Sequence, residues 1–347
     1  MNTKKKIRLM VVDDSLTIRK HIISALKNET DIIIIAEATD GKDAVIKARE
    51  LKPDVILMDM IMPVMDGLQA VEYFMEHQPI PIIIHSASKE KGVRCKIWDA
   101  ISAGALDTVN KEEAKTNPLN WKRNIIMTIK AAARMRCNRK QNFEKTIYHS
   151  PFSKRQSSDN FNLVAFGVST GGPAIIARIL KLFPNNFPLP IILVIHMAST
   201  GTETFPEWLS DKSNRKVEFA KNQMNIIDYH GIVLIAPHNH HIQLNDNRIK
   251  IFQSNPVNYC MPSIDVLFFS LSNNIRIKPI AVLLSGMGND GAKGLKAIKE
   301  SGGYTICQDQ ATSTVFGMPK AAIDMKAETI VLPDIEIPQK ICSLIGC

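Results

Sequence analysis

Short apolar runs alternate with amphipathic stretches along the first third of the chain. The apolar runs at residues 7–12, 32–37, 55–58, 80–85 and 105–109 predict strands that are buried on both faces. The stretches between them repeat apolar residues at helical spacing, as residues 17–26 do. Alternating strand and helix units of this kind predict an N-terminal (βα)5 flavodoxin-like domain, an α/β fold whose parallel sheet has helices on both faces.

A second α/β series begins at residue 161. Its predicted strands are residues 163–166, 191–195, 217–220, 232–235, 280–284 and 304–307. Residues 241–251 differ from this pattern, because apolar and polar residues alternate on both sides of the turn Asn245-Asp246-Asn247, as in a hairpin. We therefore predict a C-terminal doubly wound, mainly parallel α/β domain that also carries a β-hairpin.

The length and the charge distribution divide the chain in the same way. A chain of 347 residues suits about two domains. Residues 131–160 carry 7 basic and 2 acidic residues, whereas residues 1–130 carry 20 and 18 and residues 161–347 carry 16 and 14. We predict a domain at 1–130, a basic interdomain linker at 131–160 and a second domain at 161–347. The near-neutral domains argue against nucleic-acid binding, while the linker leaves open docking to an acidic partner or an anionic membrane surface.

The cysteines and the apolar runs bear on the cellular compartment. The six cysteines form no Cys-x-x-Cys pair, so we expect free thiols. Asp13 and Asp14 interrupt the basic and apolar N-terminal run, which is then too short for a signal peptide. Since no stretch approaches the ~20 apolar residues that span a bilayer, we expect a cytoplasmic protein without membrane insertion. We also expect a monomer.

Charged and polar side chains follow the predicted strands of the N-terminal domain. Asp13 and Asp14 follow the first strand, Asp59 the third, Ser86 the fourth and Lys111 the fifth. The carboxyl ends of parallel strands meet at one edge, where three carboxylates repel one another unless a divalent cation and a lysine offset their charge. Oxygen ligands select Mg²⁺ or Mn²⁺, and a carboxylate beside such an ion is a nucleophile for phosphoryl transfer. The alternative is that these residues are helix caps, a turn residue and solvated charges.

The sequence around these positions resembles the receiver domain of two-component response regulators. The resemblance rests on Val-Val-Asp-Asp-Ser at 11–15 and Met-Asp-Met-Ile-Met-Pro-Val-Met-Asp-Gly at 58–67, and it covers about residues 5–130. It implies that Asp59 is the phospho-acceptor and that Ser86 and Lys111 contact the phosphoryl group. The groups that it implies as Mg²⁺ ligands are Asp13, Asp14, Asp59 and the backbone carbonyl of Ile61.

Two positions depart from this family's pattern. Thr108 stands where the family usually has an aromatic residue whose burial helps to report phosphorylation. Glu112 follows Lys111 where the family usually has proline. We expect the acceptor chemistry to tolerate both changes.

A second site is predicted where the first strand of the C-terminal domain ends. Gly167-Val168-Ser169-Thr170-Gly171 fits the Gly-x-Ser-x-Gly turn that lifts a serine off the end of a strand, and the proline at 173 suits the first turn of the following helix. The turn alone is equally typical of a phosphate-binding or purely structural connection. A nucleophilic serine also needs a base and a carboxylate that orients the base.

Two other strand ends supply these partners. His196 ends the run 190–195, and Asp290 follows the run 280–284 after the turn Ser-Gly-Met-Gly-Asn at 285–289. The alternatives are that His196 is a buried histidine with satisfied nitrogens and that Asp290 is a helix cap. A cap alone would not need the glycine-rich turn before it, so we predict that Ser169, His196 and Asp290 form a catalytic triad.

Other histidines offer weaker alternatives. His238, His240 and His241 cluster after a proline, but without an acidic or cysteine partner at metal-ligand spacing they favour a polar loop over a metal site. A triad of Ser169, Asp228 and His241 would follow the chain order of α/β-hydrolases. Asp228 precedes its predicted strand instead of following one, which argues against that triad.

The ordered motifs of the second domain, with a receiver in front, resemble the catalytic domain of chemotaxis protein-glutamate methylesterases. These motifs are Gly-Val-Ser-Thr-Gly-Gly at 167–172, Val-Ile-His-Met at 194–197, Ala-Pro at 236–237 with His241, Pro-Ser-Ile-Asp-Val-Leu-Phe at 262–268 and Leu-Ser-Gly-Met-Gly-Asn-Asp-Gly-Ala at 284–292. The resemblance implies Ser169 as nucleophile, His196 as general base and then acid, and Asp290 as the orienting carboxylate. It also implies the backbone N–H of Met287 as an oxyanion donor, with Thr170 beside the nucleophile. Many relatives carry an Arg-His-Arg type segment where this chain has Tyr-Cys-Met at 259–261.

The two resemblances together imply a phosphorylation-activated serine esterase of bacterial chemotaxis. Its substrates would be methylated glutamyl side chains of chemoreceptors, and it would also deamidate receptor glutamines. Its phosphodonor would be a chemotaxis histidine kinase, its receiver would bind Mg²⁺, and its esterase site would need no cofactor. We expect the unphosphorylated receiver to hinder access to the esterase site and phosphoryl-Asp59 to relieve this. Two other classes remain: a response regulator whose second domain only binds a partner, and a transcription regulator, which the lack of a basic recognition helix disfavours.

Overall fold

The computed structural model describes residues 6–86, 91–133, 160–197 and 202–347. The chain divides into two compact units, one mainly N-terminal and the other mainly C-terminal. Most of the predicted linker, residues 134–159, lies outside the described residues, and the predicted domain boundaries stay predictions. No helix in the described part of the chain is long and apolar enough to cross a membrane.

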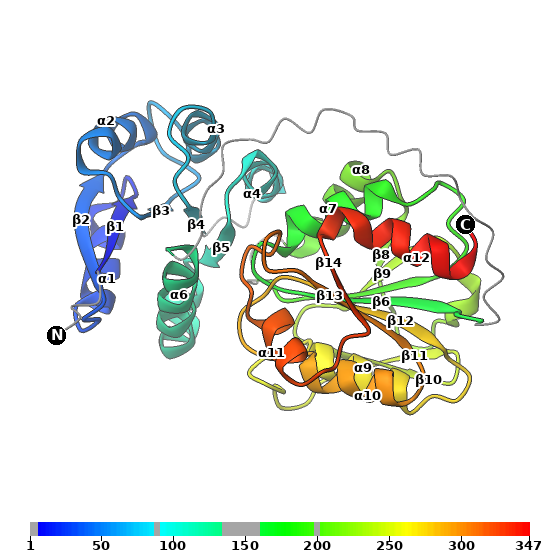
Figure 1. Ribbon diagram of the computed structural model, residues 1–347. Coiled ribbons are helices and arrows are strands. Elements are labelled where there is room, and N and C mark those ends of the chain that lie inside the picture. Colours follow the sequence, from blue (N-terminus) through cyan, green and yellow to red (C-terminus); the bar gives the residue numbers. More distant parts are fainter. Residues whose placement is uncertain (1–5, 87–90, 134–159, 198–201) are drawn as a thin grey trace. The chain divides into compact units, whose positions relative to one another are not determined.

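The N-terminal unit has, in its described residues, a five-stranded parallel sheet in the order β2-β1-β3-β4-β5 (Figure 1). This is a flavodoxin-like strand order, and it confirms the predicted (βα)5 fold. β4 and β5 begin two residues later than predicted, because Pro81 has no N–H for the ladder and the N–H of Ala105 bonds to Ala100 in the preceding helix. The strands are β1 Ile7–Val12, β2 Ile32–Ala38, β3 Val55–Met58, β4 Ile82–Ser86 and β5 Asp107–Asn110.

Helices cover both faces of this sheet (Figure 1). On one face, Trp121, Ile125 and Ile129 pack in a core with Leu9 and Val11 of β1. The helices of this face are α1 Leu16–Leu26 and α6 Pro118–Ala132, with the short α5 Glu113–Thr116 before α6. The helices of the other face are α2 Gly41–Leu51, α3 Gly67–His77 and α4 Lys91–Ala103.

The described residues of the C-terminal unit form a seven-stranded parallel sheet and a separate antiparallel hairpin (Figure 1). The sheet order is β14-β13-β12-β6-β7-β9-β8, and the hairpin pairs β10 with β11. The predicted strands and the hairpin are confirmed to within two residues, whereas the edge strand β14 was not predicted because only three residues pair there. The strands are β6 Leu163–Val168, β7 Ile191–Ile195, β8 Val217–Phe219, β9 Val233–Ile235, β10 His241–Asn245, β11 Arg248–Phe252, β12 Pro279–Leu283, β13 Tyr304–Gln308 and β14 Ile330–Leu332.

This second sheet is also covered on both faces (Figure 1). One layer contains α7 Gly172–Leu182, α8 Phe205–Ser213 and α12 Ile337–Ile345. The opposite layer contains α9 Ile264–Ser272, α10 Ala292–Glu300 and α11 Met318–Asp324, together with the hairpin. Short 3₁₀ helices are η1 Thr202–Thr204, η2 Ile226–Asp228 and η3 Asp334–Glu336.

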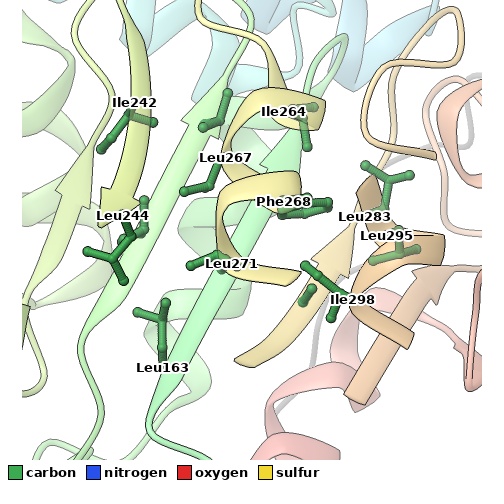
Figure 2. Close-up of a cluster of buried hydrophobic side chains, with 14 of the residues drawn as sticks. Leu163, Ile242, Leu244, Ile264, Leu267, Phe268, Leu271, Leu283, Leu295 and Ile298 are labelled. Atoms are coloured by element: carbon green, nitrogen blue, oxygen red, sulfur yellow. The ribbon is translucent and has the colours of Figure 1, made fainter. Parts of the chain in front are cut away.

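A core between the sheet and the α9–α10 layer fixes the start of α9. The side chains of Leu267, Phe268 and Leu271 on α9 are almost wholly buried, and Figure 2 shows them among residues of the neighbouring elements. Burying an apolar side chain of this size stabilises the fold by about 1.5–3 kcal/mol. Their neighbours are Leu163 of β6, Leu283 of β12, Leu295 and Ile298 of α10, and Ile242 and Leu244 of β10. The loop that leads into α9 is therefore anchored to a rigid element.

The strand order brings three carboxyl ends together. β6 lies between β7, which follows it on one side, and β12, which returns on the other side. Such a reversal of winding is the position at which doubly wound sheets leave a crevice for ligands. The register aligns Gly167 of β6 with Val194 of β7 and Leu283 of β12. The residues after these strands consequently emerge at one edge.

Candidate functional site

The predicted residues of the N-terminal unit meet at the carboxyl edge of its sheet. Lys111 follows β5 and places Nζ 2.6 Å from Oδ2 of Asp13 and 2.8 Å from Oδ2 of Asp59. All three side chains are at most 9% exposed, so the lysine offsets the repulsion of two buried carboxylates. Asp14 is exposed but still offers an oxygen within 4.8 Å of those of Asp13 and Asp59.

This cluster fits a divalent cation with oxygen ligands. Burial raises the pKa of Asp59, Lys111 lowers it and Asp13 raises it, with a net upward shift. Oδ2 of Asp13 is buried and accepts no directed hydrogen bond, since its contact with Lys111 is an ion pair without hydrogen-bond geometry. A bound cation would satisfy that oxygen and hold the carboxylates in their ionised form. Ile61, whose carbonyl is the fourth predicted ligand, lies in the loop after β3 with an exposed side chain.

The remaining predicted receiver residues lie beside this cluster. Ser86 is buried at the end of β4, and its carbonyl accepts a hydrogen bond from the N–H of Lys111 at 3.0 Å. Thr108 is half-buried on β5, where it pairs with Ile84. The N–H of Glu112 donates to Oδ1 of Asn110 at 2.9 Å. Proline has no N–H for this bond, so the structure gives Glu112 a local reason for its departure from the family pattern.

The turn after β6 has the sharp geometry that the Gly-x-Ser-x-Gly pattern predicts. The N–H of Ser169 donates to the carbonyl of Ser285 at 2.9 Å, and the carbonyl of Ser169 accepts from the N–H of Gly172 at 2.7 Å. Gly171 has a φ of 73°, in the left-handed region that favours glycine. α7 begins at the next residue with Pro173 in its first turn, as predicted. Ser169 is partly exposed at this turn.

A glycine lets the turn after β12 approach Ser169 closely. A Cβ at Gly286 would lie 2.6 Å from Cβ of Ser169, so any larger residue would displace the serine. The next residue is Met287, whose backbone N–H donates to no acceptor within the described residues. Thr170, which follows Ser169, is buried, and its carbonyl accepts the hydroxyl of Ser285 at 2.8 Å. A free N–H one residue from this close contact is the kind of group that an oxyanion hole requires.

His196 and Asp290 are joined directly. Nε2 of His196 lies 3.0 Å from Oδ2 of Asp290, and their side chains are 15% and 3% exposed. The N-cap of α10 is Gly291 and has no side-chain cap bond, so the interpretation of Asp290 as a helix cap is wrong. Asp290 instead accepts hydrogen bonds from Nδ2 of Asn258, Oγ of Ser263 and the N–H groups of Ile264 and Asp265, at 2.8, 2.8, 2.7 and 3.3 Å. A carboxylate held this firmly orients the imidazole ring.

The same contacts set the charge of the pair. Burial lowers the pKa of His196, but the hydrogen bonds with Asp290 and Cys260 outweigh it and raise the pKa to about 10. Burial raises the pKa of Asp290, but the hydrogen bond and charge of His196 hold it below the usual value. The structure thus favours an imidazolium–carboxylate pair. A general base needs the neutral ring, so this geometry favours base catalysis by His196 at alkaline pH.

The second ring nitrogen of His196 faces a cysteine. Nδ1 lies 3.6 Å from Sγ of Cys260. No hydrogen bond between described residues joins the ring to the hydroxyl of Ser169. The structure therefore brings His196 and Asp290 together and leaves the serine contact of the predicted triad unformed. Hydrogen bonds of this kind are often long in the absence of substrate.

The alternative histidine sites find no support. His241 is fully buried on β10, where Nδ1 accepts from the N–H of Ser263 at 3.2 Å and Nε2 contacts the carbonyl of Asn255 at 3.3 Å. Both ring nitrogens are thus used, and Asp228 is exposed in η2, so the rival triad is wrong. Within the described residues, the groups with metal-binding spacing do not include the cluster of His238, His240 and His241.

Sequence reasoning missed the residues that surround Asp290 and His196. Asn258, Cys260 and Ser263 lie in the loop before α9, away from any strand end. Ser263 lies in the Pro-Ser-Ile-Asp motif, but nothing in the local pattern assigns it to Asp290. Asn258 carries a further bond, from Nδ2 to Oδ2 of Asp265 at 2.8 Å, so one amide joins both carboxylates.

Comparisons with known proteins cover both units. The family model described as CheB methylesterase matches residues 164–341, and the model described as response regulator receiver domain matches residues 9–119. A protein of Methanosarcina acetivorans named protein-glutamate methylesterase/protein-glutamine glutaminase 1 is 36% identical over 342 residues, which cover 96% of this chain and 97% of the relative. A protein of Pseudomonas syringae pv. tomato with the same name and the number 3 is 38% identical over 336 residues, covering 94% and 96%. The crystal structure of the Thermotoga maritima CheB methylesterase catalytic domain is 35% identical and covers 54% of this chain and 99% of that one, with a TM-score of 0.49.

Proposed function

The chain belongs to the CheB methylesterase family, and from this we propose that it is a phosphorylation-activated serine esterase that demethylates glutamyl methyl esters on chemoreceptors. The relatives that carry the methylesterase and glutaminase name match almost the whole chain, including the receiver. The observation that carries the proposal is the hydrogen bond of His196 with Asp290, on turns that flank Ser169 at one edge of the sheet.

The proposed reaction begins with attack of Ser169 Oγ on the γ-carbonyl carbon of the ester. The serine proton passes to Nδ1 of His196, because Nε2 is already bonded to Asp290. His196 then gives the proton to the departing methoxide, so that methanol leaves and the glutamyl group stays on Ser169 as an ester. A water molecule attacks this ester with His196 again as base, which frees the glutamate side chain and restores the serine.

The N–H of Met287 is the proposed donor to the oxyanion. This role is supported by the lack of another acceptor for this N–H among the described residues and by the close contact of Gly286 with Ser169. One such donor stabilises the transition state by ~3 kcal/mol. An amide differs from the ester only in its leaving group, so the same residues would release ammonia from receptor glutamines.

The N-terminal unit is proposed to control this activity. Asp59 would accept the phosphoryl group of a chemotaxis histidine kinase, with Ser86 and Lys111 as its contacts. Asp13, Asp14, Asp59 and the carbonyl of Ile61 would hold Mg²⁺, which neutralises phosphoryl oxygens when it is bound. The buried cluster of Asp13, Asp59 and Lys111 supports this assignment. The proposed setting is the cytoplasm, where both the kinase and the methylated receptor helices are accessible.

Methanol release from methylated receptor membranes tests the esterase activity. The full chain should release labelled methanol, and Ser169→Ala should abolish the release, because the proposed reaction begins with attack by the hydroxyl of Ser169. Ser301→Ala is the matched control, since Ser301 is exposed at the end of α10 and bonds only within its own turn. No methanol release by the full chain would favour a second domain that only binds a partner, and undiminished release by Ser169→Ala would contradict the assignment of Ser169 as nucleophile.

A further inference from the structure

Cys260 is placed against His196 by a tight turn. Val257 and Cys260 exchange two backbone hydrogen bonds, of 3.1 and 2.9 Å, across the turn residues Asn258 and Tyr259. Both turn residues have a positive φ, of 52° and 64°, as a two-residue hairpin turn requires. A tyrosine takes this backbone conformation only where the surroundings impose it.

The side chain of Asn258 ties this turn to the carboxylates beneath it. Its Nδ2 donates to Oδ1 of Asp290 and to Oδ2 of Asp265, both at 2.8 Å. The same turn that delivers this amide to Asp290 delivers Sγ of Cys260 to Nδ1 of His196. The sulfur–nitrogen pair is therefore a fixed feature of the fold and not a chance contact of a surface thiol.

We propose that Cys260 and His196 form a binding site for Zn²⁺ at the mouth of the esterase site. The distance between Sγ and Nδ1 is 3.6 Å. A zinc ion with bonds of about 2.3 Å to sulfur and about 2.05 Å to nitrogen separates these atoms by about 3.6 Å at the tetrahedral angle. Thiolate and imidazole are the ligand pair that zinc prefers to hard cations such as Mg²⁺.

Asp290 supports this site from behind and is not itself a ligand. One carboxylate oxygen of Asp290 lies within 4.8 Å of the ligand atoms of His196 and Cys260. The two oxygens of this carboxylate already accept five hydrogen bonds, however, from His196, Asn258, Ser263, Ile264 and Asp265. The bond from Nε2 of His196 to Asp290 leaves Nδ1 for the metal. Metal-binding histidines almost always donate their other ring N–H to a carboxylate or carbonyl in this way.

Water can reach the coordination positions of the zinc ion that the two protein ligands leave unfilled. His196 and Cys260 are both partly exposed, so an ion can enter from solvent and complete its shell with water molecules. The expected consequence for the reaction is inhibition, and this consequence rests on the proposed function. Nδ1 is the nitrogen that takes the proton of Ser169, and a bound zinc ion occupies it.

Cobalt(II) gives a direct readout of the site, because coordination by a thiolate adds a charge-transfer band in the near ultraviolet. The full chain, in excess Mg²⁺ to fill the receiver site, should show this band on addition of Co²⁺, and Zn²⁺ should displace it. Cys260→Ser should lose the band. Cys347→Ser should keep the band. This control is needed because Sγ of Cys347 lies 2.9 Å from Sγ of Cys342, and this second pair of thiols could also bind the metal. Asp290→Asn should weaken zinc binding about 10–100-fold while keeping the band at saturation.

Methanol release then tests the consequence. Zn²⁺ should inhibit the wild-type chain, a zinc-selective chelator should restore the rate, and Cys260→Ser should resist inhibition relative to its own zinc-free rate. A band that persists in Cys260→Ser, or no thiolate band in the wild type, would overturn the zinc site and leave the contact as a simple hydrogen bond between Cys260 and His196. A zinc-loaded enzyme with an undiminished rate would keep the site and overturn the proton path through Nδ1. The cobalt spectrum can be measured even on a chain without esterase activity. Failure of the zinc site is therefore distinguishable from failure of the proposed esterase function.

Discussion

The carboxylate of Asp290 receives hydrogen bonds from the loop before α9, from the first turn of α9 and from the ring of His196. Such a group is more costly to alter than its neighbours, because every donor around it loses a partner when its charge is removed. It also fixes Nε2 as the nitrogen of His196 that faces the carboxylate. Asp265 lies nearby and is equally buried, but it does not contact His196.

Asp290→Asn should lower kcat for methanol release by about 10⁴-fold, as loss of the orienting carboxylate does in other serine triads. The amide cannot accept from Nε2 of His196 and from its backbone donors at once. Asp265→Asn is the matched control and should have a much smaller effect on kcat. A loss in Asp265→Asn as large as in Asp290→Asn would mean that both carboxylates act only through the stability of the loop.

The lowered pKa of His85 predicts how the stability of the N-terminal unit depends on pH. Burial lowers the pKa of this histidine, and the charges of Lys111 and His21 lower it further, to about 3. Its Nε2 accepts from Nε1 of Trp121 at 3.3 Å, and Nδ1 is buried without a hydrogen-bond partner. The unfolded chain takes up a proton near pH 6.5 and the folded chain only near pH 3, so stability is lost as the pH falls between these values.

Denaturant unfolding at pH 6.5 and pH 5 should show this loss. The free energy of unfolding of the wild type should fall by about 1.6 kcal/mol more than that of His85→Gln, because the histidine of the unfolded chain goes from half to almost fully protonated and a full proton contributes about 1.4 kcal/mol per pH unit. The comparison between the two proteins removes the contribution of other titrating groups. Equal pH dependence in wild type and variant would mean that the pKa of His85 is not lowered in the folded chain.

The elements that carry the C-terminal site were predictable because they are short, apolar and bounded by polar residues. The strand ends that present Ser169, His196 and Asp290 follow from alternating α/β units, since parallel strands share one carboxyl edge. The turn at Asn258 and Tyr259 was not predictable, because a tyrosine at positive φ contradicts local preference and is imposed by tertiary contacts. The partners of Asp290 likewise depend on how the loop before α9 packs, which no periodicity encodes.

Gly167 shows how closely β6 and α9 approach. A Cβ at this position would lie 2.4 Å from Cγ2 of Ile264, the first residue of α9. Gly167→Ala should therefore destabilise the C-terminal unit by about 1–3 kcal/mol through overpacking. Denaturant unfolding should show that the double variant Gly167→Ala with Ile264→Ala loses less unfolding free energy than the two single variants lose together. Strictly additive losses of unfolding free energy would contradict the steric explanation.

The whole chain joins two α/β units of the same general class, each with its own core and its own site at a carboxyl edge. One site has a buried acid–lysine cluster, which is proposed to accept a phosphoryl group, and the other has a histidine–carboxylate pair beside a serine turn. Such a pair of sites in one chain is expected when a signal received by one unit sets the rate of the other. Control of the second site by phosphorylation of the first is a proposal, and it can be tested only in the intact chain.

Asp59→Asn should remove the response of the esterase to phosphorylation. In the wild type, a small phosphodonor with Mg²⁺ should raise the rate of methanol release above the rate without phosphodonor. The variant should show no rise relative to its own rate, because the amide cannot accept the phosphoryl group. Asp43→Asn, a change on α2 that alters no member of the cluster, should keep the full response. Persistent stimulation in Asp59→Asn would contradict the assignment of the acceptor.

The central claim is that Ser169 removes methyl groups from receptor glutamates under the control of the receiver. Mass spectrometry of a methylated receptor fragment tests it most directly, after incubation with the full chain, Mg²⁺ and a small phosphodonor. We predict that wild type removes one methylene mass at each methylated glutamyl site and that Ser169→Ala leaves every site methylated. Demethylation by Ser169→Ala at the wild-type rate, or intact methyl esters after incubation with the wild type, would contradict the account.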